Sequence, residues 1–305
     1  MSTIGELGEF GLIARLTRGL PAGPAVELGP GDDAAVIGAP DGRVVATTDL
    51  LVERRHFRVD WSPPYDIGCK AAAQNLADIV AMGAAPTALL VGLAAPTSTP
   101  VEWVERLYAG LVEECGRAGA SIAGGDVVGA SEILLAITAL GDLAGERPLT
   151  RSGARPGDVV AVRGRLGYSN AGMELIDRGA EGPAQLIEAH RRPQPPYEAG
   201  AEARRAGATA LMDVSDGLVQ DLGHIAAASG VRIELDSAAL PVPAILGPDG
   251  PRHVLTGGED HAFAATFPEG AAPAAWTVVG VVTQGTGVLV DGRPGGTGGW
   301  DHFRQ

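Results

Sequence analysis

Acidic residues recur beside glycine or at the end of apolar segments in six stretches of the chain. The stretches are GPGDDAAV, TTDLL, NLADIVAMG, AGGDVV, DVSDG and TGGEDHAF, and their acids are Asp32, Asp33, Asp49, Asp78, Asp126, Asp213, Asp216, Glu259 and Asp260. Any one of these acids alone is also typical of a turn or a helix N-cap. Asp78 differs because it lies inside an apolar, helix-like segment, where a buried carboxylate is costly unless it is paired or bound to a metal.

Taken together, the acids favour a site for hard divalent cations. The chain has 6 histidines, and its 2 cysteines are not at metal-ligand spacing, so the ligands on offer are mainly oxygens. Such a set suits Mg²⁺ or Ca²⁺ rather than zinc, and Mg²⁺ shares its coordination between carboxylates and substrate phosphates. The glycines of GPG and AGG allow backbone amides to approach phosphate oxygens. The residues alone therefore predict a phosphate-handling protein with several Mg²⁺ ions.

The stretch DVSDGLVQDL shows how such a site could be built. Asp213 ends an apolar run, and Asp216 and Gly217 precede a helix-like spacing of apolar residues. We expect a strand to end and a helix to begin here, so that both carboxylates face one cleft with Ser215 between them. Asp216 could instead simply cap the helix.

The overall charge restricts the partners. A net charge of −14 argues against nucleic acid or an anionic membrane as the main partner. Phosphate substrates remain compatible, because bound divalent cations reverse the local charge. The sole lysine, Lys70, follows Cys69, so the phosphate loop G-x-x-x-x-G-K-[ST] is absent. Metal ions, arginines and backbone amides must therefore hold any nucleotide phosphates.

Apolar periodicity and turn residues predict a mixture of helices and strands. Helices are expected at 65–82, before Gly83, and at 100–115, with Thr99 as N-cap; strands at 44–49, 133–140, 158–163 and 231–235; and a hairpin over 276–290. Their irregular alternation favours an α/β fold with mixed α+β sheets over one doubly wound sheet. A break rich in Gly, Pro and Arg at 145–157 predicts two domains, 1–147 and 148–305.

Two further features concern location and cysteine chemistry. The N-terminal stretch MSTIGELGEFGLIARL lacks the pattern of a signal peptide, and no apolar run reaches the roughly 18 residues that span a bilayer. We therefore expect a cytoplasmic protein. Cys69 and Cys115 stand apart in the sequence and are expected to pack as small apolar residues.

At this point the motifs show a resemblance that covers nearly the whole chain. The stretches that carry it, in order, are GEFGLIARL at 8–16, ELGPGDDAAV at 27–36, TTDLLVERRHF at 47–57, NLADIVAMGAAP at 75–86, GGDVV at 124–128, LTRSGARPGD at 149–158, DVSDGLVQDLGHIA at 213–226 and GGEDHAF at 257–263. With them the chain resembles the thiamine-monophosphate kinase family, of the superfamily that includes aminoimidazole ribonucleotide synthetase and selenophosphate synthetase. Eight motifs in order make the resemblance specific.

The resemblance implies an activity and an assembly. It implies direct in-line transfer of the ATP γ-phosphoryl group to thiamine monophosphate, the last step of thiamine diphosphate biosynthesis, assisted by several Mg²⁺ ions. It also implies a two-domain protein whose N-terminal domain, 1–147, binds ATP and metal and pairs strand against strand in a homodimer. Residues 148–305 are expected to form the C-terminal α/β domain. Nucleic acid and membrane are not among the implied partners.

The resemblance also assigns residues. It implies that Asp49, Asp126, Asp213 and Asp216 are catalytic, and that the Mg²⁺ ligands are Asp32, Thr47, Thr48, Asp49, Asp78, Asp126, Asp213 and Asp216. The implied nucleotide contacts are Gly125, Asp126, Arg151, Ser215 and Tyr108, and the implied contacts of thiamine monophosphate are His56, Glu259 and Trp300. Asp33 and Asp260 are expected to be structural or to support neighbouring acids.

Three alternatives differ in how well they fit. Selenophosphate synthetases carry a reactive cysteine near a glycine-rich N-terminal segment, whereas the first cysteine here, Cys69, lies in a predicted helix. Aminoimidazole ribonucleotide synthetase is harder to exclude, although TTDLLVERRHF and GGEDHAF favour the kinase. A nucleotide- or metal-binding protein without catalysis is the third, and ATP binding without turnover of any thiamine compound would support it.

Overall fold

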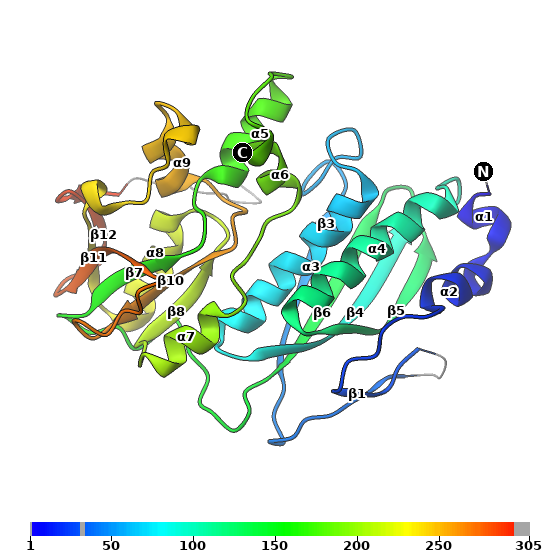
Figure 1. Ribbon diagram of the computed structural model, residues 1–305, viewed down its shortest axis with the longest axis horizontal. Coiled ribbons are helices and arrows are strands. Elements are labelled where there is room, and N and C mark those ends of the chain that lie inside the picture. The colour runs from blue at the N-terminus through cyan, green and yellow to red at the C-terminus, as the bar shows by residue number, and fades with distance from the viewer. Residues whose placement is uncertain (1, 31–33, 296–305) are drawn as a thin grey trace. The chain divides into compact units, whose positions relative to one another are not determined.

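The chain forms two compact units in the computed structural model, which describes residues 2–30 and 34–295. One unit comprises Met1–Ile79 and Ala85–Glu146, and the other comprises Val80–Ala84 and Arg147–Gln305 (Figure 1). Both units combine mixed β-sheets with helices, which confirms the predicted α/β fold class. No helix of the described residues is both long and apolar enough to cross a membrane.

A four-stranded sheet forms the centre of the first unit. Its strands, in spatial order, are β3 (Val45–Val52), β6 (Leu134–Asp142), β4 (Ala85–Ala95) and β5 (Ser121–Gly129). The pairing of β4 with β5 is parallel and the other two pairings are antiparallel. The remaining elements of this unit are α1 (Ile4–Leu7), α2 (Glu9–Thr17), β1 (Val26–Leu28), β2 (Val36–Ile37), α3 (Pro64–Ala81) and α4 (Val101–Ala118).

The two faces of this sheet differ in burial. Helices α3 and α4 cover one face, where alternate residues such as Leu51, Val91 and Ile137 are fully buried (Figure 1). On the other face, Leu50 and Val128 keep 56% and 51% of their surface exposed. We call the first the covered face and the second the open face, and the strand alternation assigns each functional side chain to one of them.

Helices α3 and α4 touch through their backbones. A Cβ atom added to Gly68 would lie 2.0 Å from the Leu107 carbonyl oxygen, and one added to Gly110 would lie 2.0 Å from that of Tyr65. Only glycine permits this approach. Cys69 and Cys115 are both buried, as expected. The prediction of Thr99 as N-cap of the second helix is wrong by one residue, because Pro100 occupies that position.

The second unit is built on a seven-stranded sheet. Its strands, in spatial order, are β13 (Arg293–Pro294), β12 (Gly287–Val290), β9 (Arg232–Leu235), β11 (Thr277–Thr283), β7 (Val159–Arg163), β10 (Ala262–Phe267) and β8 (Ala210–Val214). Its helices are α5 (Tyr168–Asp177), α6 (Ala184–Arg191), α7 (Ala199–Arg205), α8 (Leu218–Ser229), α9 (Gly250–Thr256) and the short η1 (Ser237–Ala239) and η2 (Ala244–Leu246).

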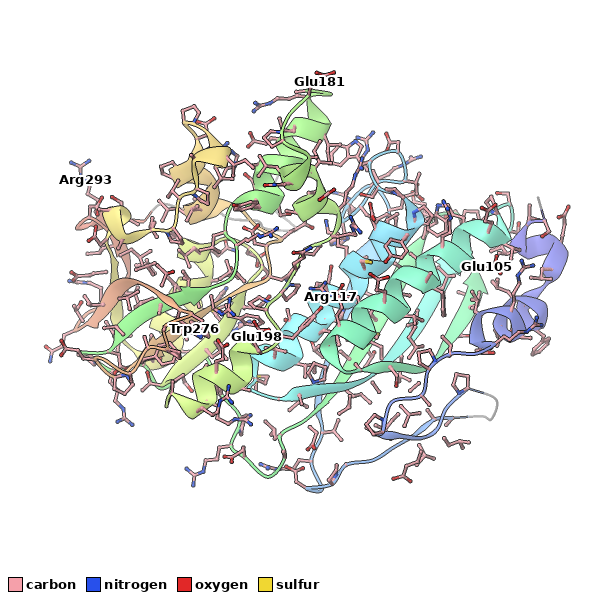
Figure 2. All side chains as sticks on the ribbon, viewed as in Figure 1. Glu105, Arg117, Glu181, Glu198, Trp276 and Arg293 are labelled. Carbon is pink, nitrogen blue, oxygen red and sulfur yellow. The ribbon has the colours of Figure 1, made fainter. Side chains whose placement is uncertain are left out.

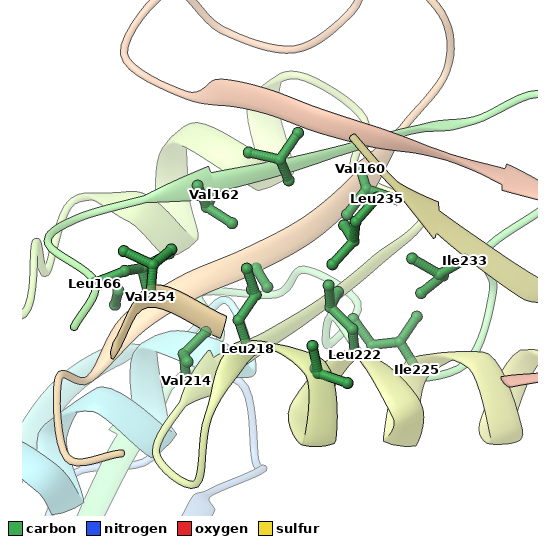
Figure 3. Packing of buried hydrophobic residues seen from close by; sticks show 14 of the residues in the cluster. Val160, Val162, Leu166, Val214, Leu218, Leu222, Ile225, Ile233, Leu235 and Val254 are labelled. Atoms are coloured by element: carbon green, nitrogen blue, oxygen red, sulfur yellow. The ribbon is translucent and has the colours of Figure 1, made fainter. Parts of the chain in front are cut away.

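Helix α8 supplies much of the core of this unit. Leu218, Leu222 and Ile225 recur at helical spacing and are fully buried in one cluster with Val160 and Ile233 of the sheet (Figure 3). Burying each such side chain contributes about 1.5–3 kcal/mol to folding. This stripe fixes the orientation of α8 and hence of the turn that precedes it.

Ion pairs and a hydrogen bond link helix α7 and its N-cap to the same sheet. The Arg163 guanidinium lies 2.7 Å from a Glu198 carboxylate oxygen and 3.3 Å from one of Glu202. The Trp276 indole N–H donates to Glu202 over 3.1 Å. Figure 2 labels Glu198 and Trp276 in this region.

The hairpin predicted over 276–290 is wrong. Strands β11 and β12 form as expected, but β9 lies between them and pairs with both, antiparallel to β11 and parallel to β12. The turn residues between the two apolar runs therefore bridge a whole strand instead of closing a hairpin. Local turn chemistry cannot reveal this, because the intervening strand comes from about 50 residues earlier in the chain.

Candidate functional site

In the first unit, polar groups of β3 and α3 meet on the covered face. The Thr47 hydroxyl donates to the Asp78 carboxylate over 2.9 Å. The Asp49 carboxylate accepts from the Gln74 amide over 3.1 Å, and the Asp49 N–H donates to the Asn75 side chain over 3.1 Å. Thr47 and Asp49 share a face because they are two residues apart on a strand. Asp78 is half-buried, and a threonine hydroxyl satisfies part of its hydrogen-bonding capacity.

Thr48 and Asp126 lie on the opposite, open face. The Thr48 hydroxyl donates to the Ile137 carbonyl over 3.0 Å, and the exposed Asp126 carboxylate accepts from the Val127 N–H over 2.8 Å. Strand register places these two residues in adjacent rows of that face, but on β3 and β5, the two edges of the sheet. Three interstrand spacings separate the edges by about 14 Å. Within one chain, Thr48 and Asp126 therefore cannot share a metal ion.

Gly125 and Tyr108 have structural roles that the sequence did not reveal. A Cβ atom on Gly125 would lie 1.9 Å from the Val91 carbonyl oxygen, so this position of β5 requires glycine. Tyr108 is buried in α4, and burial raises the pKa of its hydroxyl to about 12. The proximity of both residues to a nucleotide stays a prediction.

His56 is held by the end of β3. The Val52 N–H donates to His56 Nδ1 over 3.0 Å, and the His56 N–H donates back to the Val52 carbonyl over 3.0 Å. A nitrogen that accepts a hydrogen bond carries no proton, so the neutral ring bears its proton on Nε2. His56 is thereby oriented as a donor through Nε2.

In the second unit, the DVSDG stretch forms the turn from β8 into α8. Asp213 is a buried residue of the strand, and Ser215 and Asp216 follow in the turn, half-buried. Asp216 does not cap α8, since Gly217 holds the N-cap position. The turn is instead fixed by Asp221, whose carboxylate accepts from the N–H groups of Asp216 and Gly217 over 3.1 Å each.

Asp221 is a residue that sequence reasoning missed. It is buried, and burial followed by the nearby Asp213 carboxylate raises its pKa to about 7. The available signal was its place in the first helical turn after an Asp-Gly pair, where a carboxylate can accept the unpaired N–H groups.

The GGEDHAF stretch is joined to this turn by hydrogen bonds. The Glu259 N–H donates to the Ser215 carbonyl over 2.7 Å, and the His261 N–H donates to the Val214 carbonyl over 3.0 Å. His261 Nδ1 also lies 3.3 Å from an Asp213 carboxylate oxygen. Two motifs separated by more than 40 residues thus form one framework, which brings Asp213, Ser215 and Glu259 together.

Asp260 faces the interior and caps α5. Its carboxylate accepts from the N–H of Gly167, and from that of Ser169 over 2.8 Å, at the start of the helix. Burial is the largest influence on this group and raises the pKa of Asp260 to about 7. The role is structural, because the side chain anchors the loop that carries Glu259.

Replacing Asp260 with asparagine should change how stability depends on pH. The raised pKa means that the contribution of protonated Asp260 to stability, fully present below the unfolded pKa of 3.8, is lost as the pH rises through about 7. The Asp260→Asn variant lacks this loss. Between about pH 5.5 and the folded pKa, roughly 1.5 pKa units at about 1.4 kcal/mol each limit the change in relative stability to about 2 kcal/mol. Urea unfolding of both proteins at about pH 5.5 and about pH 8 measures it.

The exposed Asp249 provides the control for this measurement. An Asp249→Asn variant should follow the wild-type pH dependence throughout. Parallel stability curves for wild type and Asp260→Asn would contradict the raised pKa.

The remaining residues assigned by the resemblance are Arg151, Asp32 and Trp300. Arg151 is exposed in the second unit, and its carbonyl accepts from the Ser229 hydroxyl over 3.2 Å. Asp32, with its neighbour Asp33, and Trp300 lie outside the described residues.

The donor set fits Mg²⁺ that is completed by substrate. Among residues 2–30 and 34–295, no group of three or more His, Cys, Asp or Glu side chains is arranged to hold a metal ion by itself. Each unit instead offers two carboxylates with a nearby hydroxyl: Asp49, Asp78 and Thr47 in one, and Asp213, Asp216 and Ser215 in the other. Such sparse oxygen sets suit Mg²⁺, which keeps water and substrate phosphates in its coordination shell.

Similarity to known proteins extends over nearly the whole chain. Residues 31–143 match the family model described as AIR synthase related protein, N-terminal domain, and residues 155–291 match its C-terminal domain. The thiamine-monophosphate kinase of Mycobacterium tuberculosis is 51% identical over 99% of this chain and 94% of its own length.

Solved structures of thiamine-monophosphate kinases are also similar to this chain. Thiamine-monophosphate kinase from Stenotrophomonas maltophilia is 32% identical, with a TM-score of 0.82 over 92% of this chain and 95% of the other. A structure described as AaThiL complexed with AMPPCP and TMP is 34% identical, with a TM-score of 0.82 over 99% of both chains. The chain therefore belongs to the thiamine-monophosphate kinase family.

Proposed function

We propose that this protein transfers the γ-phosphoryl group of ATP to thiamine monophosphate, producing thiamine diphosphate and ADP. The observation that carries this is the likeness, over 99% of the chain, to a structure whose description names an ATP analogue and TMP. The relation to the mycobacterial kinase at 51% identity supports the same reaction. The acceptor is itself a phosphate and is ionised at neutral pH, so the reaction needs positioning and charge neutralisation more than a general base.

We propose that oxygens from both units bind Mg²⁺. In the first unit these come from Thr47, Thr48, Asp49, Asp78 and Asp126, with Asp32, and in the second from Asp213 and Asp216. Bound Mg²⁺ neutralises phosphate charge during phosphoryl transfer. The chain's own contribution is to fix these oxygens, as Gln74 does for the Asp49 carboxylate and His261 does for that of Asp213.

The substrate contacts follow the chemistry of each substrate. Arg151, Ser215 and the backbone at Gly125 are the proposed nucleotide contacts, and Tyr108 is a weaker candidate because it is buried. Thiamine carries a cationic thiazolium ring and an aminopyrimidine that donates hydrogen bonds, which a carboxylate complements. Glu259 therefore suits the thiamine end, together with Trp300 for ring stacking, while His56 offers a donor through Nε2.

A homodimer would resolve the separation of Thr48 from Asp126. The two residues lie on opposite edges of one sheet face, so pairing of β3 of one protomer with β5 of a second copy would bring them together. The exposed Leu50 and Val128 on that face give the apolar surface that such an interface needs. We therefore propose that residues 1–147 carry the dimer contacts. Cytoplasmic location stays a prediction.

A turnover assay tests the proposed function. Purified protein, ATP and Mg²⁺ are mixed with either thiamine monophosphate or free thiamine, and the products are separated by chromatography. Thiamine diphosphate should form from the monophosphate only, and EDTA should abolish its formation because the donor set requires Mg²⁺. ATP binding without product from either compound would instead favour a sibling activity, such as aminoimidazole ribonucleotide synthesis, or a binding protein.

A further inference from the structure

The loop Gly257–His261 is enclosed by its neighbours. A Cβ atom on Gly257 would lie 2.4 Å from the His253 carbonyl oxygen of α9 and 2.8 Å from the Asn170 Cβ atom of α5. One on Gly258 would lie 2.6 Å from the Ser215 carbonyl oxygen. Only glycine fits at both positions, so the loop has a single path between the two helices and the β8–α8 turn.

The backbone of this loop is strained at two residues that are not glycine. Glu259 has a φ of 62° and His261 a φ of 50°, in the left-handed region that costs an ordinary residue about 1–2 kcal/mol. The hydrogen bonds to Ser215 and Val214, and the Asp260 carboxylate at α5, hold this conformation in place. Strain maintained by its surroundings is typical of functional sites.

The side chains of the loop separate into buried and accessible positions. Asp260 and His261 keep only 7% and 6% of their surface exposed, whereas the Glu259 side chain keeps 36%. The loop therefore presents one carboxylate to solvent. The orientation of the Glu259 carboxylate matters because thiamine monophosphate is the proposed ligand of Glu259.

His190, near the end of α6, lies behind that carboxylate. It is 5% exposed, and its Nδ1 lies 3.2 Å from the Ser169 hydroxyl and 3.5 Å from Glu259 Oε2. An ionised carboxylate can only accept hydrogen bonds, so attraction to Glu259 requires a proton on Nδ1. Helix α6 lies within residues 177–198, where the sequence shows no motif.

We infer that His190 is a positioning residue of the thiamine monophosphate site, which holds the Glu259 carboxylate in the orientation that binds substrate. The inference rests on the proposed function. Ser169 supports the ring at the same nitrogen, and Asp260 fixes the peptide on the other side of the loop. The Glu259 carboxylate is thereby positioned by His190 of α6, which Ser169 of α5 supports, and both are buried and lie outside the GGEDHAF motif.

Kinetics of a His190→Leu variant test the inference. Loss of the imidazole that lies 3.5 Å from the Glu259 carboxylate should raise KM for thiamine monophosphate roughly tenfold, and KM for ATP should stay unchanged. His253, another buried histidine of this unit, bonds to Asn170 and not to Glu259, so it provides the matched control. A His253→Leu variant should lower thermal stability without this selective change in KM.

Conservative variants keep the test valid if the leucine variant folds poorly. His190→Asn retains an N–H donor near the position of Nδ1, whereas His190→Gln places it near that of Nε2. The asparagine variant should therefore keep a KM for thiamine monophosphate closer to wild type than the glutamine variant. The opposite order would overturn the inference.

A double-mutant cycle separates positioning from general stability. In a Glu259→Gln background, His190→Leu should raise KM for thiamine monophosphate no further. A full additional effect in that background, or an equal rise in both KM values for the single variant, would overturn the inference. Failure of the wild-type protein to use thiamine monophosphate is a separate outcome that would refute the proposed function itself.

Discussion

Replacement of Asp213 by asparagine should lower kcat by about a hundredfold to a thousandfold, the range seen when one electrostatic group of an active site is removed. Asparagine keeps the shape of the side chain and can accept from His261, but it loses the charge proposed to bind Mg²⁺. The variant should melt at or slightly above the wild-type temperature, because the Asp213 charge contributes to the raised pKa of Asp221. Turnover and a thermal melt are measured on the same preparation.

Asp213→Asn needs a control in which a carboxylate outside the proposed site loses its charge. Asp249→Asn, at an exposed aspartate of the same unit, should leave both turnover and melting temperature unchanged. Near-wild-type turnover by Asp213→Asn would refute the metal assignment. A drop in its melting temperature of more than about 5 °C would instead indicate a role in stability.

A Leu50→Glu substitution should convert the protein to monomers and remove most activity. Leu50 is the most exposed large apolar side chain on the open face, in the same row as Asp126. In a two-fold interface the new charge occurs twice, and burying it unpaired costs several kcal/mol. Light scattering after gel filtration measures the mass, and the turnover assay measures activity.

Val278→Glu is the matched control for this substitution. Val278 is a similarly exposed strand residue, but it lies on β11 of the second unit. This variant should keep the wild-type mass and activity. A dimer that survives Leu50→Glu, or a wild-type protein that is monomeric at assay concentration, would refute the proposed interface.

Periodicity predicted the elements of this fold better than their pairing. The Ala-rich pattern at 65–82 and the apolar stripe at 100–115 correspond closely to α3 and α4, because helix signals are local. The strands of 276–290 were predicted, and so was β9 at 231–235, but the position of β9 between β11 and β12 was not. Which strands pair is decided by packing across the sheet, and no short window of sequence contains that information.

The part of the candidate site that could be predicted consists of residues recognisable from their type and their immediate sequence neighbours. Their places at the end of apolar segments, or inside one, identified Asp49, Asp78 and Asp213 as candidates. The strand period of two could also have separated Thr48 from its neighbours, since adjacent side chains point to opposite faces. The supporting residue Asp221 was signalled only by its place in the first helical turn after an Asp-Gly pair. His190 acts only through contacts made by the folded chain, so its type and spacing gave no sign of a role.

The position of β7 within its sheet has a consequence for biosynthesis. Arg163 of β7 pairs with Phe263 of β10, and the strand on its other side, β11, comes later still. At about 5–20 residues per second, a ribosome needs roughly 5–20 s to synthesise the intervening 100 or so residues. Throughout that time the apolar segment VVAVR has been synthesised but has neither of its partner strands to pair with. The nascent second unit is therefore exposed to aggregation for as long as β10 and β11 are unmade, and chaperones that bind short apolar strands have their target here.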